Sequence, residues 1–516
     1  MKTKLFLIIS LISTSLFGVE FAPLFNNGAI LQCEMPVNVW GRAAAGETVA
    51  LFLNGKKLTE TIAGADGKWL AVLPAQAAGG AHILEAAAGG ESVKISDVWF
   101  GEVWLASGQS NMVMPLQTTF GGPERLAMTI PEIRFVRVPL TTGLPVEKEF
   151  TVADLAWMEF SPPNNKKIAA TAFYFAEQIQ QHTGRRVGII QSAYGGTPGE
   201  AWTPLTALDA HPQLNYMAEQ IREGLAAGKS KAEWEEVVAV ARQRAVALAE
   251  WRRTGEGAHP GNPIPVDLRN PWSSRTPTVL YENMIVPLIP VTTRGVIWSQ
   301  GEGNTDRPQE YGILFPAMIE AWRAAWARPD WPFLFVQIGA YTDAKAGGGP
   351  RDWPGLRAAQ TMTRDTVPNT GMALAIDIGD KDDPHARAKQ PVGDRFGRLA
   401  RNQVYGQNVV SRGPCFESAA VQPDGNVIIR FSHVDEKLIT AGGAPVTAFE
   451  VAGADGVFHP AAAEITGADS VTLSCAAVPA PAAVRYAWAN WIEPVVTLQN
   501  SEGLPAEPFS WSNDKL

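Results

Sequence analysis

From residue 98 onward, the chain alternates between nearly continuous apolar runs and segments with helical periodicity. The run VWFGEVWLA (98–106) precedes the helical stretch KIAATAFYFAEQIQQ (167–181), and RVGIIQ (186–191) follows it. Three more apolar runs come later in the chain: RGVIW (294–298), PFLFVQIG (332–339) and MALAIDIG (372–379). Strands that are apolar along their whole length are typical of a parallel sheet covered by helices on both faces. The alternation therefore predicts a three-layer α/β domain over residues 98–410.

Shorter β-like runs divided by glycines flank this domain on both sides. Residues 19–97 contain VNVWG (37–41) and TVALFLNG (48–55), and residues 411–516 contain NVIIRFS (426–432). Alternating short strands with regular turn spacing are typical of small β modules. We therefore expect an N-terminal β-sandwich and a second all-β module at the C-terminus.

A helical segment interrupts the α/β pattern from about residue 207 to 275. Trp234, Val237, Ala241 and Leu248 keep helical spacing, with glutamates and arginines between them. This pattern predicts a helical insertion, which could form the lid or wall of a cleft or could serve packing alone.

The first 18 residues, MKTKLFLIISLISTSLFG, combine two lysines with a short apolar run. This pattern is typical of a signal peptide, and the run is too short for a spanning helix. No later segment has about 18 uninterrupted apolar residues, which a membrane span needs. We therefore expect a secreted or periplasmic protein with no other membrane segment.

Charge and cysteine content narrow the function classes further. The formal net charge of -9 argues against a nucleic-acid binder, which needs a basic surface to meet phosphates. An odd count of three cysteines excludes a complete disulfide framework. Cys415 and Cys475 could pair, and free buried thiols are the alternative.

Polar residues follow four of the predicted strands. These residues are Gly108-Gln109-Ser110-Asn111, then Ser192 with Tyr194-Gly195-Gly196-Thr197, then Ser299-Gln300-Gly301-Glu302 with Asn304, and finally Asp377, Asp380, Asp382, Asp383 and His385. The carboxyl ends of parallel strands meet at one edge of a sheet, where α/β proteins place their chemistry. A serine, a glycine pair, an amide and an Asp/His pair would therefore converge there.

That set of groups is what acyl transfer requires. A serine hydroxyl is a weak nucleophile until a base such as histidine takes its proton. A carboxylate then holds the imidazole in the right tautomer. Backbone N–H groups and a side-chain amide stabilise the oxyanion of the intermediate.

Four stretches of the sequence resemble the signature blocks of the SGNH hydrolases. They are GQSNM (108–112), YGGTPGEAW (194–202), WSQGEGN (298–304) and DDPHARAKQPVGDR (382–395). More closely, they are similar to the sialate O-acetylesterase group, as are LFNNGAILQCEMPVNVWG (24–41), LYENMIVPLIP (280–290) and NSEGLPAEPF (500–509). The likeness covers nearly the whole chain after the signal peptide, and the blocks stand in the right order.

The resemblance implies a role for individual residues. Ser110 would be the nucleophile and His385 the base. The oxyanion hole would consist of Ser110, Gly196 and Gln300, with Gly195 as the less favoured alternative to Gly196. The resemblance further implies that Glu302 braces Gln300. Residues in supporting or substrate-binding positions would be Gln109, Asn111, Glu302, Asn304 and Trp202.

Three aspartates within five residues of His385 are candidates for the acid of the triad: Asp380, Asp382 and Asp383. SGNH hydrolases place it three residues before the histidine, which selects Asp382, and members of this subgroup also place it two residues before, which selects Asp383. A residue three before the histidine can reach back across a turn to the imidazole. A residue two before it can do so only in a more extended loop, and Pro384 does favour extension at Asp383. We favour Asp382 and keep Asp383 as the alternative.

Other interpretations exist for several of these residues. The acidic cluster from Asp377 to Asp383 could bind calcium, but it lacks the EF-hand spacing and glycine. No H-E-x-x-H zinc motif occurs, and we expect neither a metal nor a cofactor. Aromatic residues near the blocks could stack on sugar rings or pack in the core: Tyr194, Trp202, Trp298 and Trp353.

The combined prediction is an exported serine esterase that removes O-acetyl groups from carbohydrate by a Ser-His-Asp mechanism. The blocks identify the acyl chemistry and leave two acceptors open, sialic acid and plant hemicellulose. A non-catalytic carbohydrate-binding protein on an esterase frame is the alternative from another function class. A peptidase or lipase fits less well, because no long apolar groove is evident.

Overall fold

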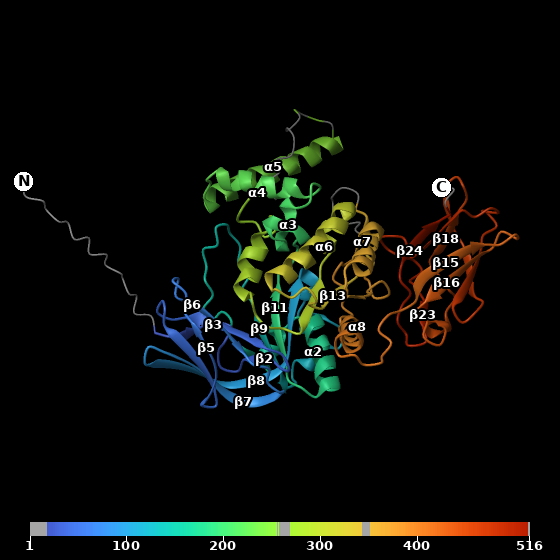
Figure 1. Ribbon diagram of the computed structural model, residues 1–516. Coiled ribbons are helices and arrows are strands. Elements are labelled where there is room, and N and C mark those ends of the chain that lie inside the picture. The colour runs from blue at the N-terminus through green and yellow to red at the C-terminus, as the bar shows by residue number, and fades with distance from the viewer. Residues whose placement is uncertain (1–17, 255, 257, 259–268, 343–350, 514–516) are drawn as a thin grey trace, which may run out of the picture.

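Figure 1 shows the computed structural model of the chain, which describes residues 18–513 except 255, 257, 259–268 and 343–350. The N-terminal strands lie at one end of the molecule, the α/β part in the middle and the C-terminal strands at the other end. The predicted signal peptide lies outside the described residues, apart from Gly18. Across the described ranges, no helix is both long enough and apolar enough to cross a membrane.

The middle of the molecule is built on a sheet with the strand order β10-β9-β11-β8-β12-β13-β14. Its strands are β8 (Glu91–Gly108), β9 (Ile130–Arg137), β10 (Met158–Phe160), β11 (Val187–Ala193), β12 (Gly295–Ser299), β13 (Phe333–Val336) and β14 (Thr370–Ala373). Neighbouring strands run parallel except for the edge pair β10 and β9. The register sets Gly108 of β8 opposite both Ala193 of β11 and Ser299 of β12. Three strands therefore end at the same level, where the motif residues begin.

Helices pack against this sheet through two apolar clusters. These helices are α2 (Ala170–Thr183), α6 (Pro308–Ala325), α7 (Trp353–Thr366) and α8 (Gln390–Leu399). A short helix, α1, spans Gly122–Arg125. Alternate residues of β8 enter different clusters: Leu105 packs with residues of α6 and α7, and Trp104 and Ala106 pack with residues of α2 and α8. Both sides of the strand are thus buried, which explains its continuous apolar run and gives the predicted mixed α/β fold.

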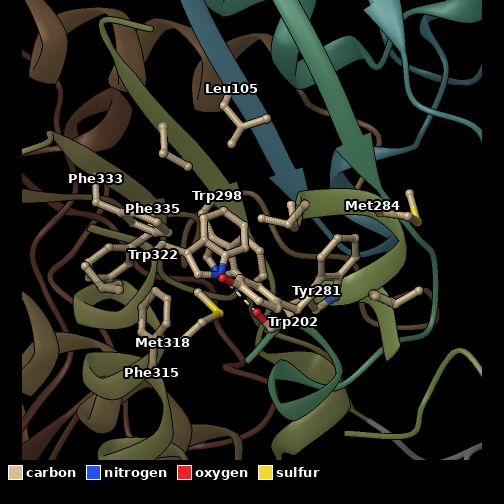
Figure 2. Packing of buried hydrophobic residues seen from close by; sticks show 14 of the residues in the cluster. Leu105, Trp202, Tyr281, Met284, Trp298, Phe315, Met318, Trp322, Phe333 and Phe335 are labelled. Carbon is tan, nitrogen blue, oxygen red and sulfur yellow. Dashed lines mark hydrogen bonds between the residues drawn. The ribbon is translucent and has the colours of Figure 1, made fainter. Parts of the chain in front are cut away.

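Several tryptophans pack together in the apolar cluster between α6 and the sheet. Figure 2 shows Trp298 of β12 surrounded by Trp202, Trp322 and Phe315, and the Trp322 indole N–H donates to the Trp202 carbonyl at 2.9 Å. Trp202, Trp298 and Trp353 are all buried. Their interpretation as sugar platforms is therefore wrong, because a sugar ring cannot reach them, whereas Tyr194 is half-buried.

The N-terminal strands join the central sheet through β8. They are β1 (Glu20–Phe21), β2 (Ile30–Gln32), β3 (Val37–Arg42), β4 (Thr48–Leu53), β5 (Lys56–Ile62), β6 (Lys68–Leu73) and β7 (Gly79–Ala88). Strands β1, β3 and β6 form a separate sheet, whereas β2 and β7 pair with the first part of β8. The predicted domain boundary at 97/98 falls inside β8, which runs unbroken through both parts.

The predicted insertion forms helices α3 (Leu205–Asp209), α4 (Asn215–Ala226) and α5 (Lys231–Thr254), which lie together at the top of Figure 1. Trp234, Ala241 and Leu248 of α5 are buried, as their helical spacing implies.

The C-terminal strands form three sheets, with the orders β15-β16-β21-β20, β17-β23 and β19-β18-β22-β24. They are β15 (Cys415–Val421), β16 (Val427–Ser432), β17 (Leu438–Thr440), β18 (Phe449–Ala452), β19 (Phe458–Pro460), β20 (Ala462–Ile465), β21 (Ser470–Ser474), β22 (Ala483–Tyr486), β23 (Leu498–Asn500) and β24 (Phe509–Ser512). All three cysteines are free. The pairing considered for Cys415 and Cys475 is not formed, because Cys415 lies against Glu507 and Cys475 against the Pro460 carbonyl.

Candidate functional site

The end of β8 is tied to both neighbouring strands. The Gln109 N–H donates to the Ser299 carbonyl at 2.8 Å, and the Tyr194 N–H donates to the Gly108 carbonyl at 3.0 Å. Gly108 has φ +130, and a Cβ at this position would lie 2.1 Å from the Ser299 oxygen. Only glycine fits there, because the strands approach so closely. This clamp fixes where the chain leaves the sheet and hence where Ser110 stands.

Ser110 begins the short 3₁₀ helix η1 (Ser110–Met112) and is partly exposed. Gly195 lies beside it, since a Cβ on Gly195 would sit 3.6 Å from the Ser110 Cβ. Gly196 is exposed and left-handed, with φ +73. Within the described ranges, the N–H groups of Ser110, Gly195 and Gly196 have no protein acceptor. These three donors are available to a developing negative charge.

The partner of His385 is Asp383. The His385 Nδ1 and Asp383 Oδ1 atoms lie 2.8 Å apart, and the His385 backbone N–H donates to the same oxygen at 2.8 Å. Partial burial raises the pKa of Asp383, but the two hydrogen bonds from His385 outweigh it and the pKa falls below its usual range. A charged Asp383 therefore accepts the Nδ1 proton and leaves Nε2 as the free ring nitrogen.

The structure thus gives the contact to the alternative carboxylate, Asp383, instead of the favoured Asp382. The Asp380 side chain accepts the backbone N–H groups of both Asp382 and Asp383, at 2.9 and 3.2 Å. This turn, followed by Pro384, directs Asp383 back to the imidazole. The four aspartates also do not act as one acidic cluster, because Asp377 is paired with Arg395 at 2.7 Å.

Asn111 connects three of the motif blocks. Its Nδ2 donates to Glu302 Oε1 at 2.6 Å and to the Pro384 carbonyl at 3.2 Å. Its Oδ1 accepts from Lys389 Nζ at 2.5 Å. The residue after Ser110 therefore holds the loop that carries His385.

Glu302 contacts Asn111, and no hydrogen bond of Glu302 to Gln300 is present among the described residues. Glu302 therefore supports the loop that carries Ser110 and Asn111, and not the Gln300 side chain as expected. Burial raises the pKa of Glu302 despite the Asn111 hydrogen bond and the nearby Lys389 and His385. Its buried Oε2 has no hydrogen-bond partner in the part of the chain that the structure describes.

Gln300 and Asn304 belong to a buried network beneath the Gly195-Gly196 turn. Gln300 Nε2 donates to Asn304 Oδ1 at 2.7 Å and to the Thr197 carbonyl at 3.4 Å. Asn304 Oδ1 also accepts the Gly199 N–H, and Asn304 Nδ2 donates to Glu200 at 2.8 Å. Both amide protons of Gln300 are thus used inside the protein. In this arrangement the amide supports the turn, and the oxyanion role expected for Gln300 stays a prediction.

Two other predicted residues also act as supports. Gln109 is buried and its Oε1 accepts the Gly303 N–H at 3.2 Å, which links the first and third blocks. Trp202 is fully buried and its indole N–H donates to Thr197 Oγ1 at 3.0 Å. It braces the turn and is not placed to bind a substrate.

Sequence reasoning missed three charged residues of this region: Lys389, Glu200 and Arg307. Glu200 is buried and pairs with Arg307 at 2.7 Å, and Lys389 is 5% exposed. Glu200 and Lys389 stand inside motif blocks, and an unexplained charge within a block would have been the signal to examine them. Arg307, three residues after the third block, carried no such signal.

The chain is similar to known carbohydrate esterases in both sequence and fold. The family described as carbohydrate esterase, sialic acid-specific acetylesterase matches residues 258–402. The sialate O-acetylesterases of Rattus norvegicus and Homo sapiens are each 28% identical to the chain, over 96% and 95% of this chain and 94% and 92% of theirs. A crystal structure of a carbohydrate acetylesterase from Xanthomonas citri is 31% identical, covers 96% of this chain and 100% of its own, and has a TM-score of 0.78. The chain therefore belongs to the sialate O-acetylesterase family of carbohydrate esterases and is a carboxylic ester hydrolase.

Proposed function

We propose that this protein is an exported serine esterase that removes O-acetyl groups from carbohydrate through an acetyl-Ser110 intermediate. The observation that carries the proposal is the Asp383–His385 contact, on a loop that Asn111, the residue after Ser110, holds through the Pro384 carbonyl. Export is supported by the lysine-flanked apolar run at the start of the chain.

The proposed reaction has two halves. In the first, Ser110 Oγ attacks the acetyl carbon and its proton passes to His385 Nε2. The bond between the acetyl carbon and the sugar oxygen then breaks, and His385 returns the proton to that oxygen. In the second half, water gives a proton to His385 and attacks the acetyl carbon of acetyl-Ser110. The bond to Ser110 Oγ then breaks, His385 returns the proton to that oxygen, and the product leaves as acetic acid, which ionises to acetate. Asp383 keeps the imidazole in the tautomer that both halves need.

The oxyanion of each intermediate would be stabilised by backbone donors. The open N–H groups of Ser110 and of Gly195 or Gly196 are the candidates, because Gln300 is engaged elsewhere. Each such donor is worth roughly 3–4 kcal/mol in the transition state.

The substrate is an acetylated carbohydrate, by analogy with the relatives' names. Sialic acid and plant hemicellulose remain the two acceptors to test. The exposure of the His385 and Asp383 side chains, 40% and 56%, is compatible with an ester presented on a larger glycan. The non-catalytic alternative is not retained, because the family is one of hydrolases.

The finer architecture is also part of the proposal. We infer three layers, with α2 and α8 on one face of the sheet and α6 and α7 on the other. The separate apolar clusters of the two helix pairs support this arrangement. The strands before β8 and after residue 414 support two flanking all-β modules.

The test compares the wild type with Ser110→Ala on 4-nitrophenyl acetate and on acetylated sialosides, xylan and xyloglucan, with acetate release measured. We expect Ser110→Ala to reduce kcat by more than about 10⁴-fold, as for other serine nucleophiles. Equal activity of both proteins would contradict the nucleophile assignment. The panel identifies which acceptor carries the acetyl group.

A further inference from the structure

The side chains of Lys389, Asn111 and Glu302 form a chain of hydrogen bonds next to the loop that carries His385. Lys389 Nζ donates to Asn111 Oδ1, and Asn111 Nδ2 donates to Glu302 Oε1. The cation at one end and the carboxylate at the other allow a single orientation of the Asn111 amide, with oxygen toward Lys389 and nitrogen toward Glu302. A flipped amide would turn its N–H₂ toward the ammonium and its oxygen toward the carboxylate.

The orientation of this amide matters for the geometry of the site. The second proton of Asn111 Nδ2 goes to the carbonyl of Pro384, the residue before His385. The Thr171 hydroxyl donates to the backbone carbonyl of Asn111 at 3.2 Å and so holds the main chain at this residue. Because Asn111 follows Ser110 directly, this hydrogen bond sets the separation between the nucleophile loop and the histidine loop.

We infer that Lys389 is a positioning residue that fixes the Asn111 amide and thereby holds His385 in place for Ser110. The inference rests on the proposed function of Ser110 and His385. The adjoining cavity of about 30 Å³, lined by Asn111, Glu302, Pro384 and Lys389, has room for about one water and none for a sugar ring. Lys389 therefore acts through Asn111 and not on the substrate.

The charges around Lys389 are consistent with this role. Glu302 and Asp383 face it and favour its protonated form, and Asp380 lines the same cavity. His385 interacts electrostatically with the Glu302 carboxylate. Burial nevertheless lowers the pKa of Lys389 to about 8, so the ammonium is the main form at neutral pH.

The test is Lys389→Met, which keeps most of the length of the side chain and removes its donor and charge. Two quantities are measured in the full chain: kcat and KM for 4-nitrophenyl acetate, and the rate at which a fluorophosphonate labels Ser110. We expect both kcat and the labelling rate to fall about 10- to 100-fold with KM nearly unchanged, because small misplacements of reacting groups cost rates of this size. In an Asn111→Ala background, the same change should add less than twofold.

Arg395→Met is the matched control. Arg395 is another buried cation of α8, but it donates to the Leu374 carbonyl and to Asp377. We expect this variant to lose stability and to keep kcat within about threefold for the folded protein. Lys389→Gln is made alongside Lys389→Met and judged by the same criterion, should the methionine variant not fold.

Several results would overturn the inference: kcat and labelling within twofold of wild type in the Lys389 variants, an equal loss in Arg395→Met, or full additivity with Asn111→Ala. These results are distinct from a failure of the proposed function. In that case Ser110→Ala would retain activity, and the fluorophosphonate would not label Ser110 in the wild type.

Discussion

Two carboxylates at opposite ends of the parallel sheet, the buried Glu102 and the partly buried Glu302, have opposite electrostatic surroundings. Glu102 lies at the amino end of the parallel part of β8, and Glu302 follows the carboxyl end of β12. Arg185 and Arg294 donate to Glu102 at 2.7 and 2.8 Å. Glu302 has one neutral donor, Asn111, and an unpartnered oxygen within the described residues.

The pKa values of the two carboxylates show the consequence. Burial alone would raise the pKa of both carboxyl groups. For Glu102 the hydrogen bonds and charges of Arg294 and Arg185 outweigh burial, and its pKa lies below the usual glutamate range. For Glu302 burial dominates, and its pKa lies above that range. Carboxylate charge is therefore fully compensated where the sheet joins the N-terminal strands. It is left undercompensated beside the candidate site, and perturbed groups of this kind are common at functional sites.

Glu102 and two residues near it have the donor atoms of a possible metal site. Cys33, Glu34 and Glu102 offer three donor atoms within 4.8 Å of one another. The two arginines already neutralise Glu102, and burial raises the pKa of the Cys33 thiol to about 12. These residues form a structural junction between the N-terminal strands and the sheet.

The largest expected effect on the fold comes from Glu102→Ala. It removes the carboxylate that Arg294 and Arg185 share, and only Arg185 keeps another, Glu34. Removing one partner of a buried ion pair typically costs about 3–5 kcal/mol. We expect that loss in the free energy of unfolding, measured with urea, and nearly unchanged kcat for the folded fraction. A loss below about 1 kcal/mol, or a specific loss of kcat, would remove the contrast between the two ends.

The next largest effect concerns the acid of the triad. Asp383→Asn should lower kcat by about 10²-fold with KM little changed, because the ring loses the carboxylate that fixes its tautomer. The effect should be smaller than for a fully buried acid, since solvent screens an exposed carboxylate. Asp382→Asn is the matched control one residue away, and we expect a change of less than about threefold. The reverse ranking would return the role to Asp382.

The smallest effect is in the pH dependence of stability. The pKa of Glu302 is raised in the folded state, so its contribution is present below the ordinary glutamate value of about 4.3 and is lost as pH rises through the folded value. The pKa of Glu102 is lowered, so its contribution is present above about 4.3 and is lost as pH falls.

These opposite slopes can be measured with two matched variants. Glu302→Gln should remove the loss of stability on the alkaline side, because glutamine has no carboxyl group to ionise. Glu102→Gln should remove the acid-side loss, at a lower overall stability. The free energy of unfolding is measured from pH 4 to pH 8, and slopes of the same sign for both changes would contradict the comparison.

The sequence alone determined which strand ends meet at the site. Ser110, Gly195 and Gln300 follow apolar runs, and parallel pairing in register brings the ends of such strands together. The buried, period-free runs also determined the mixed α/β fold, and the motif blocks identified the family. These features are local or follow from strand direction, so a linear pattern is sufficient to predict them.

The tertiary structure decided what each side chain contacts. Asn111 and Glu302 are 191 residues apart, and no local pattern shows that the acid meets Asn111 instead of Gln300. The choice of Asp383 over Asp382 depends on the turn at Asp380, and the amide of Gln300 is drawn into a network by Asn304 and Thr197.

Burial was decided in the same way. The sequence left Trp202, Trp298 and Trp353 open between core and cleft, because tryptophan suits both. Only the packing of α6 and α7 on the sheet encloses them. Lys389 shows the same limit: its place in a motif block was visible, but its contact with Asn111 exists only because α8 begins beside the nucleophile loop. Direction and spacing are properties of the chain, whereas hydrogen-bond partners are set by which distant segments the fold brings within about 3 Å.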